Sequence, residues 1–168
     1  MRELITNFYE YDSWATEKLL KTLEQLTPEQ YTAPGCSGHG SIRDTLAHLL
    51  NVQYGWLSWY DGSMEIPAAF TASAPKENFV TVESAHARWK VVDAQTRAFL
   101  GNLTEKQLTE EKSFTRSNGV TSSLPLWKLL LHTANHGTHT RGQIIAAVRR
   151  AEINPGWYDL IGYEMSKL

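Results

Sequence analysis

Three histidines crowd into one short segment near the C-terminal end of the chain, which reads His132-Thr-Ala-Asn-His136-Gly-Thr-His139. On a helix that turns about 100° per residue, His132 and His139 lie roughly 40° and 60° to the same side of His136. All three imidazoles therefore share one sector of the helix, and the apolar residues around it predict that the sector is partly buried. Because imidazole nitrogens are common ligands of divalent ions, the pattern indicates a metal site.

His48 is the natural complement of these histidines, since it falls on the apolar face of a second expected helix together with Leu49 and Trp56. Metal sites in helix bundles are built from side chains on facing helices. His48 is therefore expected to be a ligand. The alternative is a hydrogen-bonded core histidine at position 48 and a wet groove lined by the other three.

The remaining histidines and the cysteine carry weaker signals. His39 stands in a glycine-rich loop and His86 near the start of another expected helix, so both are expected at the surface. Cys36 is the only cysteine, which excludes an internal disulfide and a cysteine-based zinc cluster. A catalytic role for a lone cysteine in such a loop is not expected.

Helical periodicity predicts the elements that must position these residues. The expected class is all-α, a four-helix bundle with a long crossover at 62–79 between helices two and three. A short β-hairpin is expected at 110–124, around Asn118-Gly119. The four helices are expected at about 2–25, 41–60, 82–100 and 125–150.

Start and stop signals support these boundaries. Ser41 and Thr81 are suited to cap the N-termini of the second and third helices, and Gly101 to end the third. Ser123 and Pro125 are expected to open the last helix, as its N-cap and first residue.

The length and composition of the chain indicate one globular domain, residues 1–168. Apolar residues make up 42% of the chain, but no run approaches the length that crosses a bilayer, so no membrane partner is expected. The acidic N-terminal segment does not fit a secretory signal, which favours a cytoplasmic location. A net charge of −2 without a basic run gives no case for nucleic-acid binding.

Three segments together are similar to a known family. They are the aromatic-rich opening helix, the second helix with IRDTLAHLLNVQYGW and the last helix with HTANHGTHTRGQI. The chain resembles the DinB family of metal-binding four-helix bundles, which is related to YfiT-like hydrolases and DinB-type thiol-dependent transferases. The resemblance implies up-down-down-up connections, three histidine ligands around zinc, nickel or a similar ion, and a homodimer.

Carried over by position, the resemblance places ligands at His48 and His136. In many relatives the second ligand of the last helix comes four residues later, where this chain has Thr140. Either His139 takes over that role, or His132 completes the site from one turn earlier. We favour His139, because the order His139-Thr140 looks like the usual order with its two residues exchanged. His132 is kept as the alternate ligand or as a partner of the ligands.

Other residues of the same segment receive supporting roles. Arg141 and Gln143 are expected to orient ligands or bind substrate. Gly137 and Gly142 are expected to permit close approach of a neighbouring helix.

Three protein ligands would leave a divalent ion with an open position, which is the mark of a catalytic site. The resemblance implies delivery of a low-molecular-weight thiol to a small electrophile. Hydrolysis is the alternative enzyme activity, but the last helix carries no Asp or Glu as general base between Leu124 and Arg150. A non-catalytic metal-binding or small-molecule-binding stress protein is the alternative of a different class. No individual catalytic residue is assigned.

Overall fold

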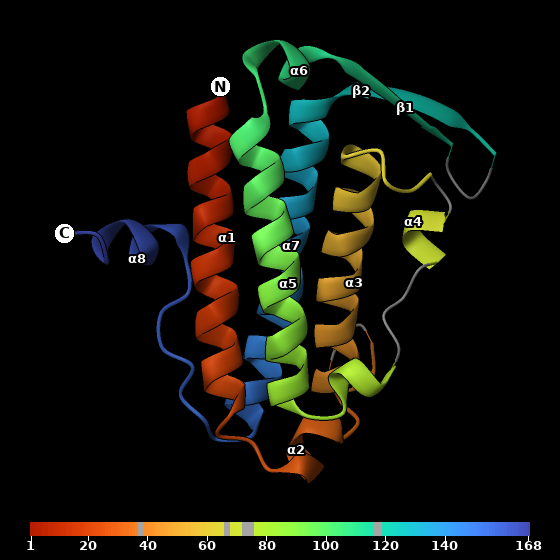
Figure 1. The fold of residues 1–168 in the computed structure, drawn as a ribbon. Coiled ribbons are helices and arrows are strands. Elements are labelled where there is room, and N and C mark those ends of the chain that lie inside the picture. Colours follow the sequence, from red (N-terminus) through yellow and green to blue (C-terminus); the bar gives the residue numbers. More distant parts are fainter. Residues whose placement is uncertain (37–38, 66–67, 72–75, 116–118) are drawn as a thin grey trace.

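The computed structural model describes residues 1–36, 39–65, 68–71, 76–115 and 119–168, and most of them are helical. Helix α7 packs against both α1 and α3, and α5 packs against the same two helices from the other side. In Figure 1, α3 and α5 run in the same direction, opposite to α1 and α7. The four long helices are α1 (Arg2–Leu23), α3 (Ile42–Tyr60), α5 (Val82–Asn102) and α7 (Leu126–Arg150).

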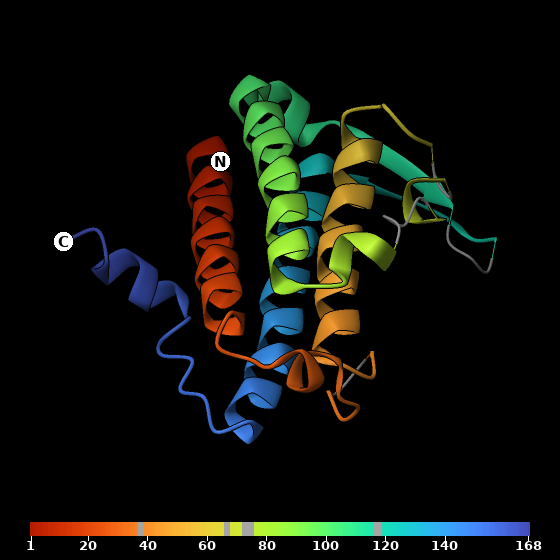
Figure 2. The ribbon, with the colours of Figure 1, turned by 60° about the horizontal axis from the view of Figure 1, so that its bottom comes forward.

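Shorter elements connect and cover the long helices. Two short helices lie in the segment between α3 and α5. The C-terminal short helix lies beside α1 in both Figure 1 and Figure 2. None of the helices in the described part of the chain combines the length and the hydropathy needed to span a bilayer. The short elements are α2 (Pro28–Thr32), α4 (Ala68–Thr71), the 3-10 helix η1 (Lys76–Phe79), α6 (Glu105–Thr109) and α8 (Leu160–Met165).

A two-stranded antiparallel hairpin precedes α7, which confirms the predicted hairpin. Strand β1 (Glu111–Thr115) pairs with β2 (Thr121–Pro125) in a register that runs from Glu111 opposite Pro125 to Thr115 opposite Thr121. Gly119 has a φ of 81°, the left-handed backbone expected of a turn glycine. Its predicted turn partner Asn118 lies outside the described residues.

The predicted N-caps of α3 and α5 are confirmed, but the predicted end of α5 at Gly101 is wrong, because the helix continues to Asn102 and Leu103 is its C-cap. Ser41 accepts a hydrogen bond from the backbone N–H of Asp44, and Thr81 accepts one from Ser84. The predicted start of α7 is wrong, because Ser123 belongs to β2 and its hydroxyl donates to Glu111. Pairing with β1 extends β2 through Pro125, so the helix begins one residue later than expected, without a side-chain cap.

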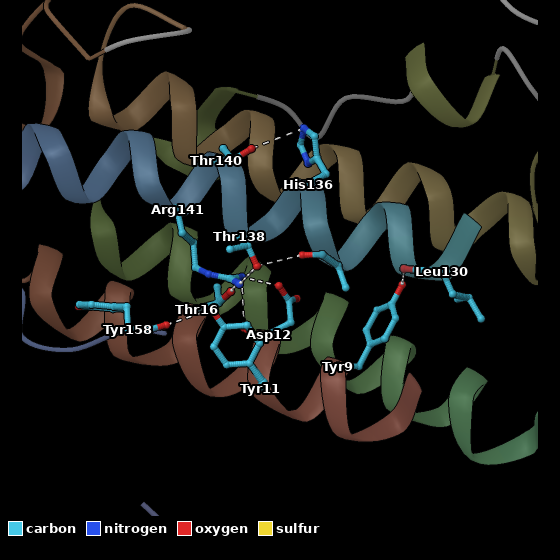
Figure 3. A network of polar contacts seen from close by, with 11 residues as sticks. Tyr9, Tyr11, Asp12, Thr16, Leu130, His136, Thr138, Thr140, Arg141 and Tyr158 are labelled. Atoms are coloured by element: carbon cyan, nitrogen blue, oxygen red, sulfur yellow. Dashed lines mark hydrogen bonds and ion pairs between the residues drawn. The ribbon is translucent and has the colours of Figure 1, made fainter. Parts of the chain in front are cut away.

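A buried ion pair joins α1 to α7. The guanidinium of Arg141 lies against the carboxylate of Asp12, and both side chains are 2% exposed. Figure 3 shows the guanidinium pointing from α7 towards α1, where it also donates to the Thr16 hydroxyl at 3.0 Å. A second donation reaches the hydroxyl of Thr138 at 3.3 Å. These bonds satisfy a charge that would otherwise be very costly to bury.

Gly137 makes this contact possible, as the sequence predicted. A β-carbon at Gly137 would collide with the carboxylate of Asp12 and press on the guanidinium of Arg141. Gly142 is different, since a β-carbon there would meet no atom within 4 Å. The prediction that Gly142 permits close helix approach is therefore wrong, because that residue faces solvent.

The two glycines give a matched test. We expect Gly137→Ala to lower the free energy of unfolding by about 1–3 kcal/mol, because the methyl group overpacks the Asp12 contact. Gly142→Ala should raise it by about 0.5–1 kcal/mol, since alanine is the better helix former at an open position. Urea unfolding followed by circular dichroism measures both, and equal midpoints for the two variants would contradict the close contact.

Candidate metal centre

Two histidines from different long helices meet between α3 and α7. The Nε2 atoms of His48 and His136 are 3.1 Å apart, and their ring centroids are 5.0 Å apart at an angle of 60°. Both side chains are partly buried. The predicted partnership between a helix-two and a last-helix histidine is therefore present as a contact between their nitrogens.

The surroundings keep this pair neutral. Partial burial, together with positive charge on His48 and on the other neighbouring histidines, lowers the pKa of His136 to about 4. Partial burial also lowers the pKa of His48, with His39 as the second cause. Neutral imidazole is the form that binds metal ions, so both rings are ready to act as ligands near neutral pH.

The two other histidines of α7 lie at its exposed side. His132 meets the ring of Trp56 edge-on, with centroids 5.5 Å apart. His139 is exposed, and its Nε2 lies 3.2 Å from the side-chain nitrogen of Gln143. The predicted sector is therefore only partly buried, with His136 as its most enclosed imidazole.

The polar residues that follow His136 have different surroundings. Thr140 is 1% exposed, and its hydroxyl lies 3.5 Å from Nε2 of His136. Figure 3 shows Thr140 and His136 on one side of α7 and Arg141 on the other. Arg141 therefore contacts α1 and faces away from the histidines. Gln143 lies beside His139.

His39 is a member of the site that sequence reasoning missed. It is exposed, as predicted, yet its ring stacks on that of His48 with centroids 3.8 Å apart and planes 22° apart. A histidine flanked by glycines in a loop gives no periodic signal. Its position next to the N-terminus of the helix that carries His48 was the available hint.

His86 and Cys36 lie in contacts that the sequence did not reveal. His86 is only 15% exposed in its side chain and lies 2.9 Å from a carboxylate oxygen of Glu17. Cys36 is buried, and its sulfur accepts from the Thr45 hydroxyl at 3.3 Å. Both side chains fit structural roles.

The donor set fits a divalent ion in part. Two imidazole nitrogens that each bind zinc at 2.0–2.1 Å in a tetrahedral site lie about 3.3 Å apart. The 3.1 Å between His48 and His136 is close to that spacing. Across the described residues, no three His, Cys, Asp or Glu side chains converge into a set that could hold an ion. A third protein ligand would therefore have to come from a side chain that moves.

Comparison with known proteins agrees with the helical fold. The family model described as the DinB family matches residues 1–167. The chain belongs to the DinB family. This confirms the resemblance found in the sequence.

One relative and two solved structures match over most of their length. Protein DinB of Bacillus subtilis (strain 168) is 26% identical over 151 residues, which cover 90% of this chain and 88% of that protein. The crystal structure of a DinB-like protein from Bacillus cereus ATCC 10987 superposes with a TM-score of 0.68 at 20% identity, covering 92% of this chain and 95% of that one. A conserved protein from Enterococcus faecalis gives 0.63 at 17% identity, covering 84% and 93%. At these identities the two structures show a shared fold.

The lowered pKa of His136 predicts acid sensitivity of the metal-free protein. In the unfolded chain histidine titrates near 6.5, so between about pH 6.5 and 4 the unfolded state binds a proton that folded His136 resists. Stability should therefore fall as pH falls through this window and stay level above it. Urea midpoints between pH 4 and 8 measure the effect, and NMR titration of His136 should give a pKa below 6.5.

The control is His136→Asn, which removes the titrating group and should flatten this part of the pH profile. An unchanged profile in the variant would contradict the assignment of the effect to His136.

Proposed function

We propose that this DinB protein is an up-down-down-up four-helix bundle that binds a divalent metal, zinc or nickel, and transfers a low-molecular-weight thiol to small electrophiles. The observation that carries the proposal is the 3.1 Å approach of the His48 and His136 nitrogens from α3 and α7. His48 and His136 would be the fixed ligands, with the third from one of the nearby histidines. The sequence favours His139 for that place, with His132 as the alternate.

The residues around the pair support ligation. Neutral imidazoles need not release a proton to bind an ion, provided that the proton on each ring sits on Nδ1. In the metal-free pair one Nε2 donates a hydrogen bond to the other. Metal binding therefore requires that the proton of this ring move to Nδ1, but it releases no proton from the pair. Trp56, which contacts His132, places an aromatic wall beside this end of the site.

A divalent ion at these nitrogens would supply Lewis acidity, which lowers the pKa of a thiol or water beside it. In the transfer, the thiol loses its proton to solvent and its sulfur forms a new bond to an electrophilic carbon. With a chloroarene the carbon–chlorine bond then breaks and chloride leaves. No oxidant or reductant is needed.

Hydrolysis has less support from the chain. The segment from Leu124 to Arg150 contains no Asp or Glu, and Asp44, one turn before His48, is ion-paired with Arg43 at 2.9 Å. Attack by water generally needs a proton acceptor placed beside it. Thiol transfer does not, because a thiol gives up its proton far more easily than water does.

A non-catalytic small-molecule-binding role is the second candidate, and one cavity favours it. A hollow of about 210 Å³ opens between α1 and α5, and its lining includes charged residues such as Arg2 and Asp93 as well as Tyr9 and Gln53. Gln53 is 5% exposed, so the cavity reaches a buried amide. No histidine lines this hollow, so a ligand there would act apart from the metal.

Metal content tests the site directly. Untagged protein should carry about one zinc or nickel ion per chain by elemental mass spectrometry. His48→Ala and His136→Ala should each lose it, because each removes one of the two nitrogens that face each other. His86→Ala is the matched control and should keep the ion, since His86 contacts Glu17 on another side of the molecule. Wild type without stoichiometric metal, even after reconstitution, would refute the proposal.

Activity tests the transfer. The metal-loaded protein should accelerate the thiol-dependent loss of chlorodinitrobenzene, with a rate that saturates in the thiol. His136→Ala should abolish the acceleration, and His86→Ala should retain it. Metal-loaded protein that shows no saturable thiol-dependent rate would remove the transferase function and leave the binding function.

A further inference from the structure

The loop before α3 is fastened to both α3 and α7. Arg150 donates to the backbone oxygen of Gly35 at 2.6 Å. Cys36 accepts from the Thr45 hydroxyl of α3, and its sulfur lies 3.7 Å from the backbone oxygen of Gln143. These contacts hold Cys36 at the junction of α3 and α7, the two helices that carry His48 and His136.

His39 stands at this junction. A backbone bridge between Cys36 and Gly40 closes the turn that contains it, with Cys36 N–H donating to the Gly40 oxygen at 3.0 Å. The turn lays the His39 ring on that of His48, with 3.8 Å between centroids. His48 thus has an imidazole on two sides, His39 from the loop and His136 from α7.

The other possible third ligands are less well placed. The ring of His132 lies against Trp56, and His139 is exposed beside Gln143. Thr140 lies near His136, but a neutral hydroxyl is not among the usual protein ligands of zinc. Among these side chains, the ring in direct contact with one of the paired imidazoles is that of His39.

We propose that His39 completes the metal site as its third ligand, so that the ion is held by two helices and a loop. This inference rests on the proposed metal-binding function. In the stacked arrangement the rings of His39 and His48 lie face to face, so the His39 ring must slide off the face of its neighbour to join the other two.

The position of His39 allows that movement. Its side chain is exposed, and Gly40 after it has a φ of 93°, a backbone conformation that glycine adopts without strain. Rotation about the side-chain bonds of His39 moves its ring without breaking a helical hydrogen bond. His39 is therefore a side chain through which the site can adjust to an ion.

The test is zinc affinity measured by competition with a chromophoric chelator. We expect His39→Ala to weaken zinc binding by at least about 100-fold. Loss of a group that only hydrogen-bonds to a ligand weakens metal binding by about 100-fold at most. His132→Ala and His139→Ala are matched controls and should stay within about threefold of wild type. The metal-free urea midpoint of His39→Ala should equal that of wild type, because the side chain is exposed.

A substitution that changes the ligand atom gives a spectroscopic readout. Cobalt-loaded His39→Cys should gain a near-ultraviolet thiolate-to-cobalt charge-transfer band that wild type and cobalt-loaded His139→Cys lack. Wild-type affinity in His39→Ala, or a loss confined to His139→Ala or His132→Ala, would overturn the role of His39 and leave the metal site standing. Wild type that binds neither zinc nor cobalt would overturn both proposals.

Discussion

The orientation of α7 depends on the buried contact between Arg141 and Asp12. A guanidinium and a carboxylate that are both withdrawn from water can remain there only while they face each other, so the contact allows one rotation of α7 against α1. His136 lies five residues before Arg141 on the same helix, which places it on a different side. When Arg141 faces α1, His136 faces α3. Gly137 then lets the two helices come close enough for the ion pair to form.

The hydroxyl groups in the same region reinforce this arrangement. Tyr9 donates to the backbone oxygen of Leu130 at 3.1 Å, and Tyr60 donates to that of Leu129 at 2.8 Å. Both bonds reach α7 from neighbouring helices, one from α1 and one from α3. The first half of α7 is thus attached to both neighbours through its own carbonyl groups, while its second half is attached through Arg141. The helix that carries three of the six histidines is therefore held along both of its halves.

Periodicity was sufficient to predict the long helices, because each has an apolar face, and α3 and α5 also have recognisable N-caps in Ser41 and Thr81. The predicted start of α7 was wrong because Ser123 belongs to β2, which pairs with β1. The residues next to Ser123 in the sequence do not reveal this pairing. The His48–His136 contact was predictable from helical faces. The stacking of His39 on His48 and the pairing of Arg141 with Asp12 were not, because both depend on how distant segments meet in space.

The separation of the two sides of α7 has a consequence for how such a protein can diverge. Substitutions at Arg141 or Gly137 disturb the packing on which folding depends. Positions such as His132 and His139 point towards solvent, where a new side chain meets little resistance. A lineage built on this scaffold can therefore exchange residues around the histidine pair while the opposite face of the helix keeps the chain folded, so chemistry and foldability can be selected almost independently.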